Sequence, residues 1–485
     1  MGDRAPAHTE TASDRGTFRR APRLPAAGLI LEALLWLIVA GSVLAIGSVH
    51  PWAYIPLWFA CLTAGGLLAI RAAFADVDVR GRLLPRAPLL LPGLAFLLWV
   101  MVQLVPFPPS GKPLTLSVPD TSRGLAFVAS LLMLHLVAAA VFDRREARER
   151  FRRFVAGLGL VLGLAALIQV ASGAARIYGF FTPLERSGTI FGPFVNRNHF
   201  AGYMLMVVFT SFGLLARAWR RYRRRVGERP NPRRRLVALS TPEGTALLFT
   251  VIPATAAVAG LVASASRGGL VAFGAGLVLA GLGLRRRQGV PAWGLALAFA
   301  VMTLSWYGLE RLGIRFNEAA TDAPGRTAVW KDSLGRMRGH WMTGTGFNTF
   351  GLSMGHTKPW ALPKGATPWP PEIETAVAMG ERPGTRAVPD LASLGWYREA
   401  HNDYIQTLVE TGVPGLLIAL WAAAAAVRAV RGDPWLLAAV ASVLLHVLVD
   451  FDLQIPAIPV LLVSLVAMRP DAPGAARVIT RSTPA

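Results

Sequence analysis

Stretches of roughly 20 apolar residues recur along this chain, and each is long enough to cross a lipid bilayer as a helix. Of the 485 residues, 53% are hydrophobic and only 16% are charged, whereas a soluble protein carries about 25% charged residues. This composition excludes a soluble enzyme and a disordered chain. The single cysteine, Cys61, lies in an apolar stretch, so a disulfide-stapled secreted domain is excluded as well. The sequence predicts an all-α integral membrane protein.

Twelve apolar stretches are candidate membrane spans. They cover approximately residues 28–48, 53–74, 88–105, 124–142, 154–172, 199–216, 245–264, 268–284, 291–309, 413–427, 435–449 and 455–468.

The connections between these spans predict their orientation, because cytoplasmic loops carry an excess of Lys and Arg. The connection 143–153 holds six Arg, and the connection 217–235 holds ten Arg against one Glu. These and the shorter Arg clusters fall on the same side when both termini are cytoplasmic. The net charge of +22 therefore indicates loops facing an anionic inner leaflet and not a nucleic-acid partner.

This topology divides the chain into tails, spans and one large loop. Residues 1–27 and 469–485 are predicted cytoplasmic tails, and residues 28–309 hold spans one to nine. Residues 413–468 hold spans ten to twelve. Between them, residues 310–412 form a predicted large extracytoplasmic loop, because basic and acidic residues nearly balance there and Trp, Pro and Gly suit a folded segment.

His401 lies at the end of this loop, just before a short amphipathic helix that the pattern predicts over residues 403–411. Asn402 suits the N-cap and Gly412 suits the C-terminal stop. A helix N-terminus disfavours an imidazolium and attracts anions, so His401 would stay neutral and accept a proton beside a bound phosphate. The alternative is a loop histidine that bonds to the backbone. The apolar and polar faces of the helix are Ile405, Leu408 and Val409 against Asp403, Gln406 and Glu410.

Several arginines lie on the predicted outer side, where the charge rule for loops does not require them. Arg267 is the single charge in the forty residues from Thr245 to Leu284 and sits at the turn between two spans. An arginine there is a functional hypothesis, with a snorkelling or helix-capping residue as the alternative. Arg326 begins a short helical pattern that is followed by the turn Gly344-Thr345-Gly346.

A third polar group lies at the mouth of span six. Arg186, Asn196, Arg197, Asn198 and His199 suit recognition of sugar hydroxyls and phosphates, although a polar loop rim explains them equally well.

These residues together indicate a type of chemistry. Guanidinium groups bind diphosphates bidentately, and a neutral histidine deprotonates a hydroxyl. The combination suits group transfer from a lipid diphosphate to an acceptor alcohol, in which the leaving group departs as an anion stabilised by arginine. The sequence holds neither an HExxH motif nor a nucleotide-binding glycine loop, so we expect no metal and no cofactor.

The motif around His401 is similar to that of the bacterial O-antigen ligase/Wzy polymerase superfamily. His401-Asn402, nine residues and then Gly412-Val413-Pro414-Gly415 follow the ligase pattern, with Leu416 in place of the family's Thr. Four further stretches resemble family elements: Ser266-Arg267-Gly268-Gly269, Arg326 to Trp330 followed by Gly344-Thr345-Gly346, residues 194–201 with Arg197 in place of Pro, and the late element at residues 449–457 found in exopolysaccharide members.

The resemblance implies a GT-C-like fold and a metal-independent, inverting transfer from an undecaprenyl-pyrophosphate glycan on the periplasmic face of the bacterial inner membrane. It makes His401 the base that activates the acceptor hydroxyl, and it makes Arg267 and Arg326 the residues that hold the donor pyrophosphate. The acceptor is lipid A-core or a growing polysaccharide. The side chains expected to bind substrate are Arg186, Asn196, Arg197, Asn198, Asn402 and Glu410.

Two alternatives remain open on this evidence. A Wzy-type polymerase shares the chemistry but transfers to a second lipid-linked repeat unit; Leu416 and the element at 449–457 favour it, whereas the histidine motif favours a ligase. A transporter or flippase of lipid-linked glycans predicts ionisable residues near mid-membrane, and Glu32 and His135 are the few such residues here.

Overall fold

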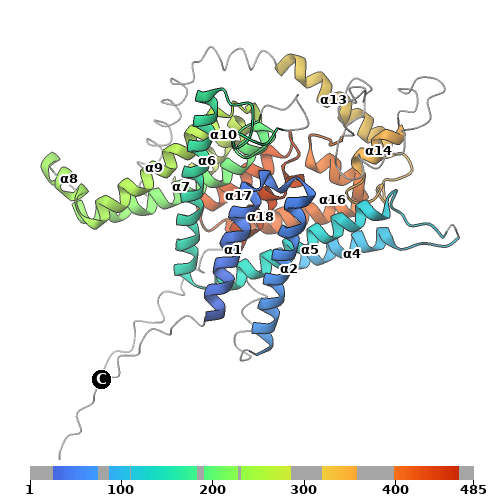
Figure 1. The fold of residues 1–485 in the computed structure, drawn as a ribbon, viewed down its shortest axis with the longest axis horizontal. Coiled ribbons are helices and arrows are strands. Elements are labelled where there is room, and N and C mark those ends of the chain that lie inside the picture. The colour runs from blue at the N-terminus through green and yellow to red at the C-terminus, as the bar shows by residue number, and fades with distance from the viewer. Residues whose placement is uncertain are drawn as a thin grey trace, which may run out of the picture.

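In the computed structural model of the protein, the described residues are 26–74, 87–109, 111–182, 190–227, 231–285, 319–357 and 398–468. Within these ranges the chain is helical, and its β pairing consists of isolated bridges. The helices (Figure 1) are α1 (Ala26–Leu44), η1 (Ile46–Ser48), α2 (Pro51–Ala73), α4 (Leu90–Leu104), α5 (Val118–Val141), α6 (Arg145–Ser172), α7 (Arg197–Val226), α8 (Pro232–Leu239), α9 (Pro242–Ala263), α10 (Arg267–Arg285), α13 (Ala319–Arg336), α14 (Phe350–Thr357), α16 (Asp403–Val430), α17 (Pro434–His446), η4 (Asp452–Gln454) and α18 (Ala457–Ala467).

The predicted spans coincide with helices wherever the structure describes them; the ninth, 291–309, lies outside the described residues. Among the described helices, α2, α5, α6, α7, α9, α10 and α16 are long and apolar enough to cross a membrane, seven in all. Helices α1, α4, α17 and α18 are apolar but shorter. The protein is therefore all-helical with several helices suited to a membrane, while the count of twelve spans, the GT-C-like architecture and the periplasmic loop stay predictions.

Several helices begin at a polar side chain that caps the first turn. Ser117, Asn196, Thr241, Asn402 and Asp433 each accept a backbone N–H of the helix that follows. Helix α16 contains a break, as the sequence predicts: one glycine of the histidine motif, at position 412, has φ 67° and ψ −173°. Residues 403–411 are therefore a separate first segment of α16.

Helix α7 is the centre of the helical assembly. Its residues from His199 to Ala216 are buried, and it packs against α6, α9, α10, α17 and α18. By contrast, outer helices expose large apolar side chains, of which Phe59 on α2, Ile168 on α6 and Phe249 on α9 are examples. An apolar outer surface of this kind suits contact with lipid.

The Arg-rich ends of several helices come together at one end of the assembly. Arg152 of α6 and Arg217 of α7 both lie close to Asp433, which precedes α17, at 3.1 and 3.5 Å. The last turns of α10 join them, because a Cβ on Gly283 would lie 3.0 Å from Pro434. This grouping agrees with the prediction that these connections share one side, and their orientation in the membrane stays a prediction.

Candidate functional site

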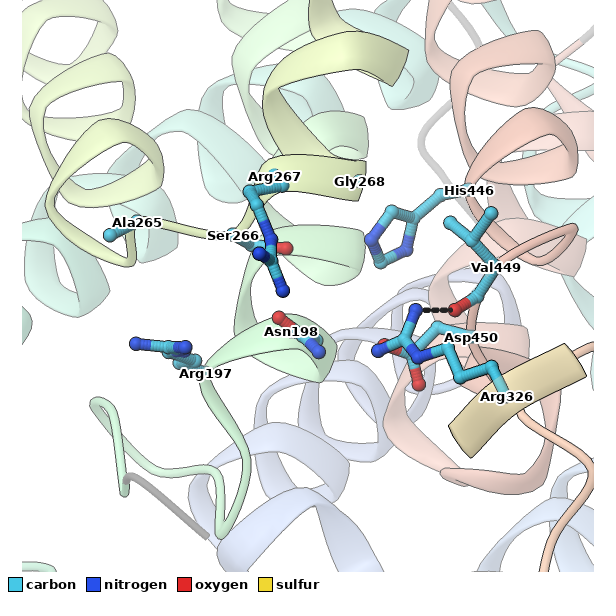
Figure 2. A pocket seen from close by; sticks show the side chains of 10 residues that line it. All are labelled: Arg197, Asn198, Ala265, Ser266, Arg267, Gly268, Arg326, His446, Val449 and Asp450. Atoms are coloured by element: carbon cyan, nitrogen blue, oxygen red, sulfur yellow. Dashed lines mark hydrogen bonds between the residues drawn. The ribbon is translucent and has the colours of Figure 1, made fainter. Parts of the chain in front are cut away.

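A pocket of about 100 Å³ lies at the other end of α7 and α10, where their first residues meet α13 and the connection between α17 and α18. Figure 2 shows the side chains of Asn198, Arg267 and Arg326 converging on it, while that of Arg197 extends away from them. The fold thus brings four sequence-predicted residues to one place. The lining is Arg197, Asn198, Ala265, Ser266, Arg267, Gly268, Arg326, His446, Val449 and Asp450.

Arg267 is the first residue of α10 and follows a tight turn. The Ser266 hydroxyl accepts the N–H of Gly269 at 3.2 Å and so caps the helix. A Cβ on Gly268 would lie 2.9 Å from the Val449 side chain, and one on Gly269 would lie 2.7 Å from a side chain of α7. The Ser-Arg-Gly-Gly sequence therefore allows α7 and the α17–α18 connection to approach the base of Arg267 closely.

Arg326 lies in the middle of α13 and connects that helix to the pocket. The helix begins at Ala319, so the prediction that Arg326 begins the helix is wrong. The Arg326 guanidinium donates a hydrogen bond to the carbonyl of Val449 at 2.5 Å. One turn later, the indole N–H of Trp330 donates to the carbonyl of Ala400 at 2.9 Å, directly before the motif histidine. Helix α13 thus fixes both an arginine of the pocket and the backbone that carries His401.

His401 precedes α16, and its neighbour Asn402 holds it there. The Asn402 side chain accepts the N–H groups of Tyr404 and Ile405 at 3.0 and 3.1 Å, which confirms the predicted N-cap. It also donates to the carbonyl of Leu448 at 2.9 Å. His401 itself has φ 50°, in the left-handed region that non-glycine residues rarely adopt. The backbone at this histidine is therefore strained, a feature that clusters at functional sites.

The imidazole of His401 faces a buried carboxylate. Its Nδ1 lies 3.8 Å from Oδ1 of Asp450, and the Nε2 of His199 lies 3.5 Å from the same oxygen. Both rings pack edge-on against Phe451. Burial raises the pKa of Asp450, but the two imidazoles outweigh it and hold that pKa well below its usual range. Since Asp450 also lines the pocket, it joins His401 to the arginines.

A second histidine–carboxylate pair lies close to the first. Nδ1 of His446, at the end of α17, is 2.6 Å from Oδ2 of Asp452, and both side chains are almost completely buried. Sequence reasoning missed Asp450, Asp452 and His446 as site residues. A signal existed, since two carboxylates between apolar stretches eleven and twelve are as unexpected there as Arg267 is at its own turn.

Three of these side chains lie close enough together to hold a metal cation. One ligand atom each from His199, Asp450 and Asp452 lies within 4.8 Å of the others. However, Asp452 is already paired with His446, and Asp450 is shared by two imidazoles. The adjoining pocket is also lined by three guanidinium groups. This donor set fits histidine–carboxylate pairing better than it fits a metal.

Other residues predicted to bind substrate contact the protein's own backbone. The side chain of Asn196 caps α7 by accepting the N–H two residues later at 2.8 Å. Glu410 is buried, and its carboxylate accepts the N–H groups of Asn348 and Phe350 at 3.0 and 3.1 Å at the start of α14. Arg186 lies outside the described residues. The substrate roles of these residues stay predictions.

The Gly344-Thr345-Gly346 turn holds the end of the helix that begins after His401. The N–H groups of Thr345 and Gly346 donate to the carbonyls of Val409 and Glu410, both at 2.9 Å. Gly344 has φ 68°, and a Cβ there would overlap the Glu410 backbone. The glycines therefore permit a backbone contact that fixes the far end of the histidine segment.

Comparison with known families covers part of the chain that lines this pocket. Residues 252–376 match the O-Antigen ligase family. The resemblance to the O-antigen ligase/Wzy superfamily is thereby confirmed. No curated protein matches the chain. The O-antigen ligase match contains Arg267, Arg326 and the Gly344–Gly346 turn, while His401 and Asp450 follow it in the sequence and are brought beside it by the fold.

Proposed function

We propose that this protein is an O-antigen ligase-like membrane glycosyltransferase. It moves a glycan from an undecaprenyl-pyrophosphate donor to a hydroxyl of lipid A-core or another surface acceptor, on the periplasmic face of the inner membrane. One observation carries the proposal: Asp450 lies between the His401 imidazole and a pocket lined by arginines, so a base and an anion site are adjacent.

The charge of the pocket supports a diphosphate donor. Its lining holds three guanidinium groups, those of Arg197, Arg267 and Arg326, against the one carboxylate of Asp450. The net positive charge of the lining suits a lipid-linked diphosphate, which is a dianion. Guanidinium groups bind phosphate oxygens bidentately, and the N-terminus of α10 adds partial positive charge at the same place.

The pair of His401 and Asp450 supplies the base that deprotonates the acceptor hydroxyl. Asp450 lies on the Nδ1 side of His401, which leaves Nε2 to take the proton of the acceptor hydroxyl. The carboxylate stabilises the imidazolium that forms. The acceptor oxygen bonds to the anomeric carbon as the bond from that carbon to phosphate breaks, with inversion, and the lipid diphosphate leaves as an anion held by the arginines.

Reconstituted transfer tests this proposal. Purified protein in liposomes receives undecaprenyl-pyrophosphate oligosaccharide and lipid A-core, and the glycosylated product is measured. His401→Ala is expected to abolish transfer with unchanged insertion and thermal stability. His340→Ala, which removes a histidine outside the site, is expected to leave transfer unchanged. Wild-type activity in His401→Ala would overturn the assignment of the base.

A polymerase is the second candidate function, and one observation favours it. The element at residues 449–457, which resembles exopolysaccharide members, supplies Asp450 and Asp452 to the site. The same liposomes without lipid A-core separate the two functions. A growing ladder of products that is lost in His401→Ala identifies a polymerase, whereas transfer only after lipid A-core is added identifies a ligase.

The ionisable groups that a transporter would use serve helix contacts instead. Glu32 of α1 accepts two hydrogen bonds from the guanidinium of Arg150 at 2.8 and 2.6 Å. His135 of α5 contacts the carbonyl of Val463 through Nδ1 at 2.8 Å, and its Nε2 accepts the N–H of Leu89 at 3.3 Å. These contacts are structural, so they give the transporter hypothesis no support.

A further inference from the structure

His446 presents a buried ring nitrogen for which the protein supplies no partner. Its Nδ1 is held by Asp452, and the side chain is about 1% exposed. Its Nε2 has no hydrogen-bond partner within the described part of the chain. A buried polar atom without a hydrogen-bond partner costs folding free energy and is rare in native proteins. A bound ligand would supply the missing partner of this nitrogen.

The unpaired nitrogen faces the arginine pocket. His446 lines that pocket, and in Figure 2 its ring points toward the space in which Arg267 and Arg326 converge. A Cβ on Gly268 would lie 3.1 Å from Nε2, so the nitrogen lies against the first turn of α10. The histidine therefore reaches the same space as the two arginines.

We propose that His446, held by Asp452, is a further binding residue for the donor diphosphate, to which its Nε2–H donates a hydrogen bond. The inference rests on the proposed function and adds a binding residue to its donor site. An imidazolium paired with a carboxylate retains both N–H groups as donors. A group held this way needs an acceptor at Nε2, and in a pocket of net positive charge that acceptor is an anion.

His446 and His401 therefore differ in what they contact. His401 is 37% exposed and lies on the far side of Asp450, where an acceptor hydroxyl can reach it. His446 is buried and lines the pocket next to Arg267 and Arg326. His401 accepts the proton of the acceptor hydroxyl, and His446 binds the leaving diphosphate.

Two amide substitutions separate a binding role from a structural one. Asn in place of His446 keeps a donor near the Nδ1 position, where it can still reach Asp452, but removes the donor at Nε2. Gln places its amide near the Nε2 position and gives up the contact with Asp452. Binding of a polyprenyl diphosphate without a glycan is measured on the purified full-length protein in nanodiscs, alongside thermal unfolding.

We expect His446→Asn to weaken polyprenyl diphosphate binding about ten- to hundredfold, the usual effect of losing a charge-assisted hydrogen bond. His446→Gln is expected to lose less than His446→Asn, and His340→Asn to bind as the wild type does. A structural role predicts the opposite order, since the Asn variant would then retain binding and the Gln variant would lose it. That order, or wild-type binding by both variants, would overturn the proposal. If the Asn variant does not fold, retained binding by a stable Gln variant supports it and lost binding overturns it.

The binding assay also keeps this proposal distinct from the proposed reaction. A wild-type protein that does not bind polyprenyl diphosphate overturns both the donor and the role of His446. A wild-type protein that binds it, with loss in His446→Asn but no transfer in liposomes, leaves His446 as a diphosphate-binding residue and refutes the proposed reaction.

Discussion

The substitution Asp450→Asn is the most direct test of how the site works. Asparagine has nearly the same shape as aspartate, so the change removes the negative charge next to His401 and leaves the packing in place. Asp450 is buried, and its carboxylate also accepts the N–H of Phe451 at 3.0 Å, a contact that the Asn side chain oxygen can keep. We therefore expect the packing of the site to be kept and the transfer step to slow.

The size of the effect follows from the distance between the charges. At the 3.8 Å that separates Nδ1 of His401 from Oδ1 of Asp450, an effective dielectric constant of about 20 gives roughly 4 kcal/mol of attraction between the carboxylate and an imidazolium. Since His401 is 37% exposed, water weakens this attraction, and about 2–3 kcal/mol remains for the transition state. We therefore expect kcat to fall about 10²-fold.

The assay is transfer in liposomes with the donor at saturation, together with the polyprenyl diphosphate binding assay. Glu149→Gln is the matched control, because it removes a carboxylate from an ion pair with Arg152 at the opposite end of the assembly. Wild-type kcat in Asp450→Asn, or an equal fall in kcat in Glu149→Gln, would refute the reasoning.

Three further predictions concern Arg267, Gly344 and the dependence of stability on pH. Arg267→Lys should raise KM for the donor about tenfold, because an ammonium cannot reproduce a bidentate guanidinium contact; an unchanged KM would show that charge alone suffices. Gly344→Ala should lower the free energy of unfolding by more than about 2 kcal/mol, since its φ is 68° and a Cβ would overlap the backbone of α16. Gly335→Ala is the control, because a Cβ at position 335 has no atom within 4 Å. Thermal unfolding of the two variants should show a loss of stability in Gly344→Ala and none in Gly335→Ala. The lowered pKa of Asp450 adds stability that is complete above about pH 4 and is lost as the pH falls through the folded-state pKa; Asp450→Asn should therefore flatten the acid side of the stability profile, and an unchanged acid side would contradict this.

Local sequence signals predicted the helices well because each depends on neighbouring residues. Apolar stretches of bilayer length correspond to helices, and the break at Gly412 and the cap at Asn402 occur where the pattern placed them. These features require no knowledge of what lies across the fold. The same holds for Arg267, whose unexpected charge within a long apolar region marks it in the sequence alone.

The carboxylates of the site could not be assigned this way, since their partners are remote in sequence. His401 and Asp450 meet only because the segment after His401 packs against the connection between α17 and α18. The amphipathic helix at 403–411 illustrates a related limit. Its polar residues Asp403, Gln406 and Glu410 are buried, because they satisfy backbone and side-chain groups inside the protein. Of the apolar face, Val409 is buried while Ile405 and Leu408 are only partly buried. In an apolar surrounding, a polar face turns toward the protein interior.

The four residues 449–452 set the geometry of the whole site. The carbonyl of Val449 accepts from Arg326, Asp450 faces His401, and Asp452 holds His446. A base that meets an acceptor from outside must be partly exposed, whereas groups that bind a diphosphate act more strongly where water is excluded. Under the proposed function, placing both requirements on one short connection would fix the separation between the base and the diphosphate site. In the proposed reaction these residues would hold the base and the leaving group in fixed positions, which is a form of preorganisation.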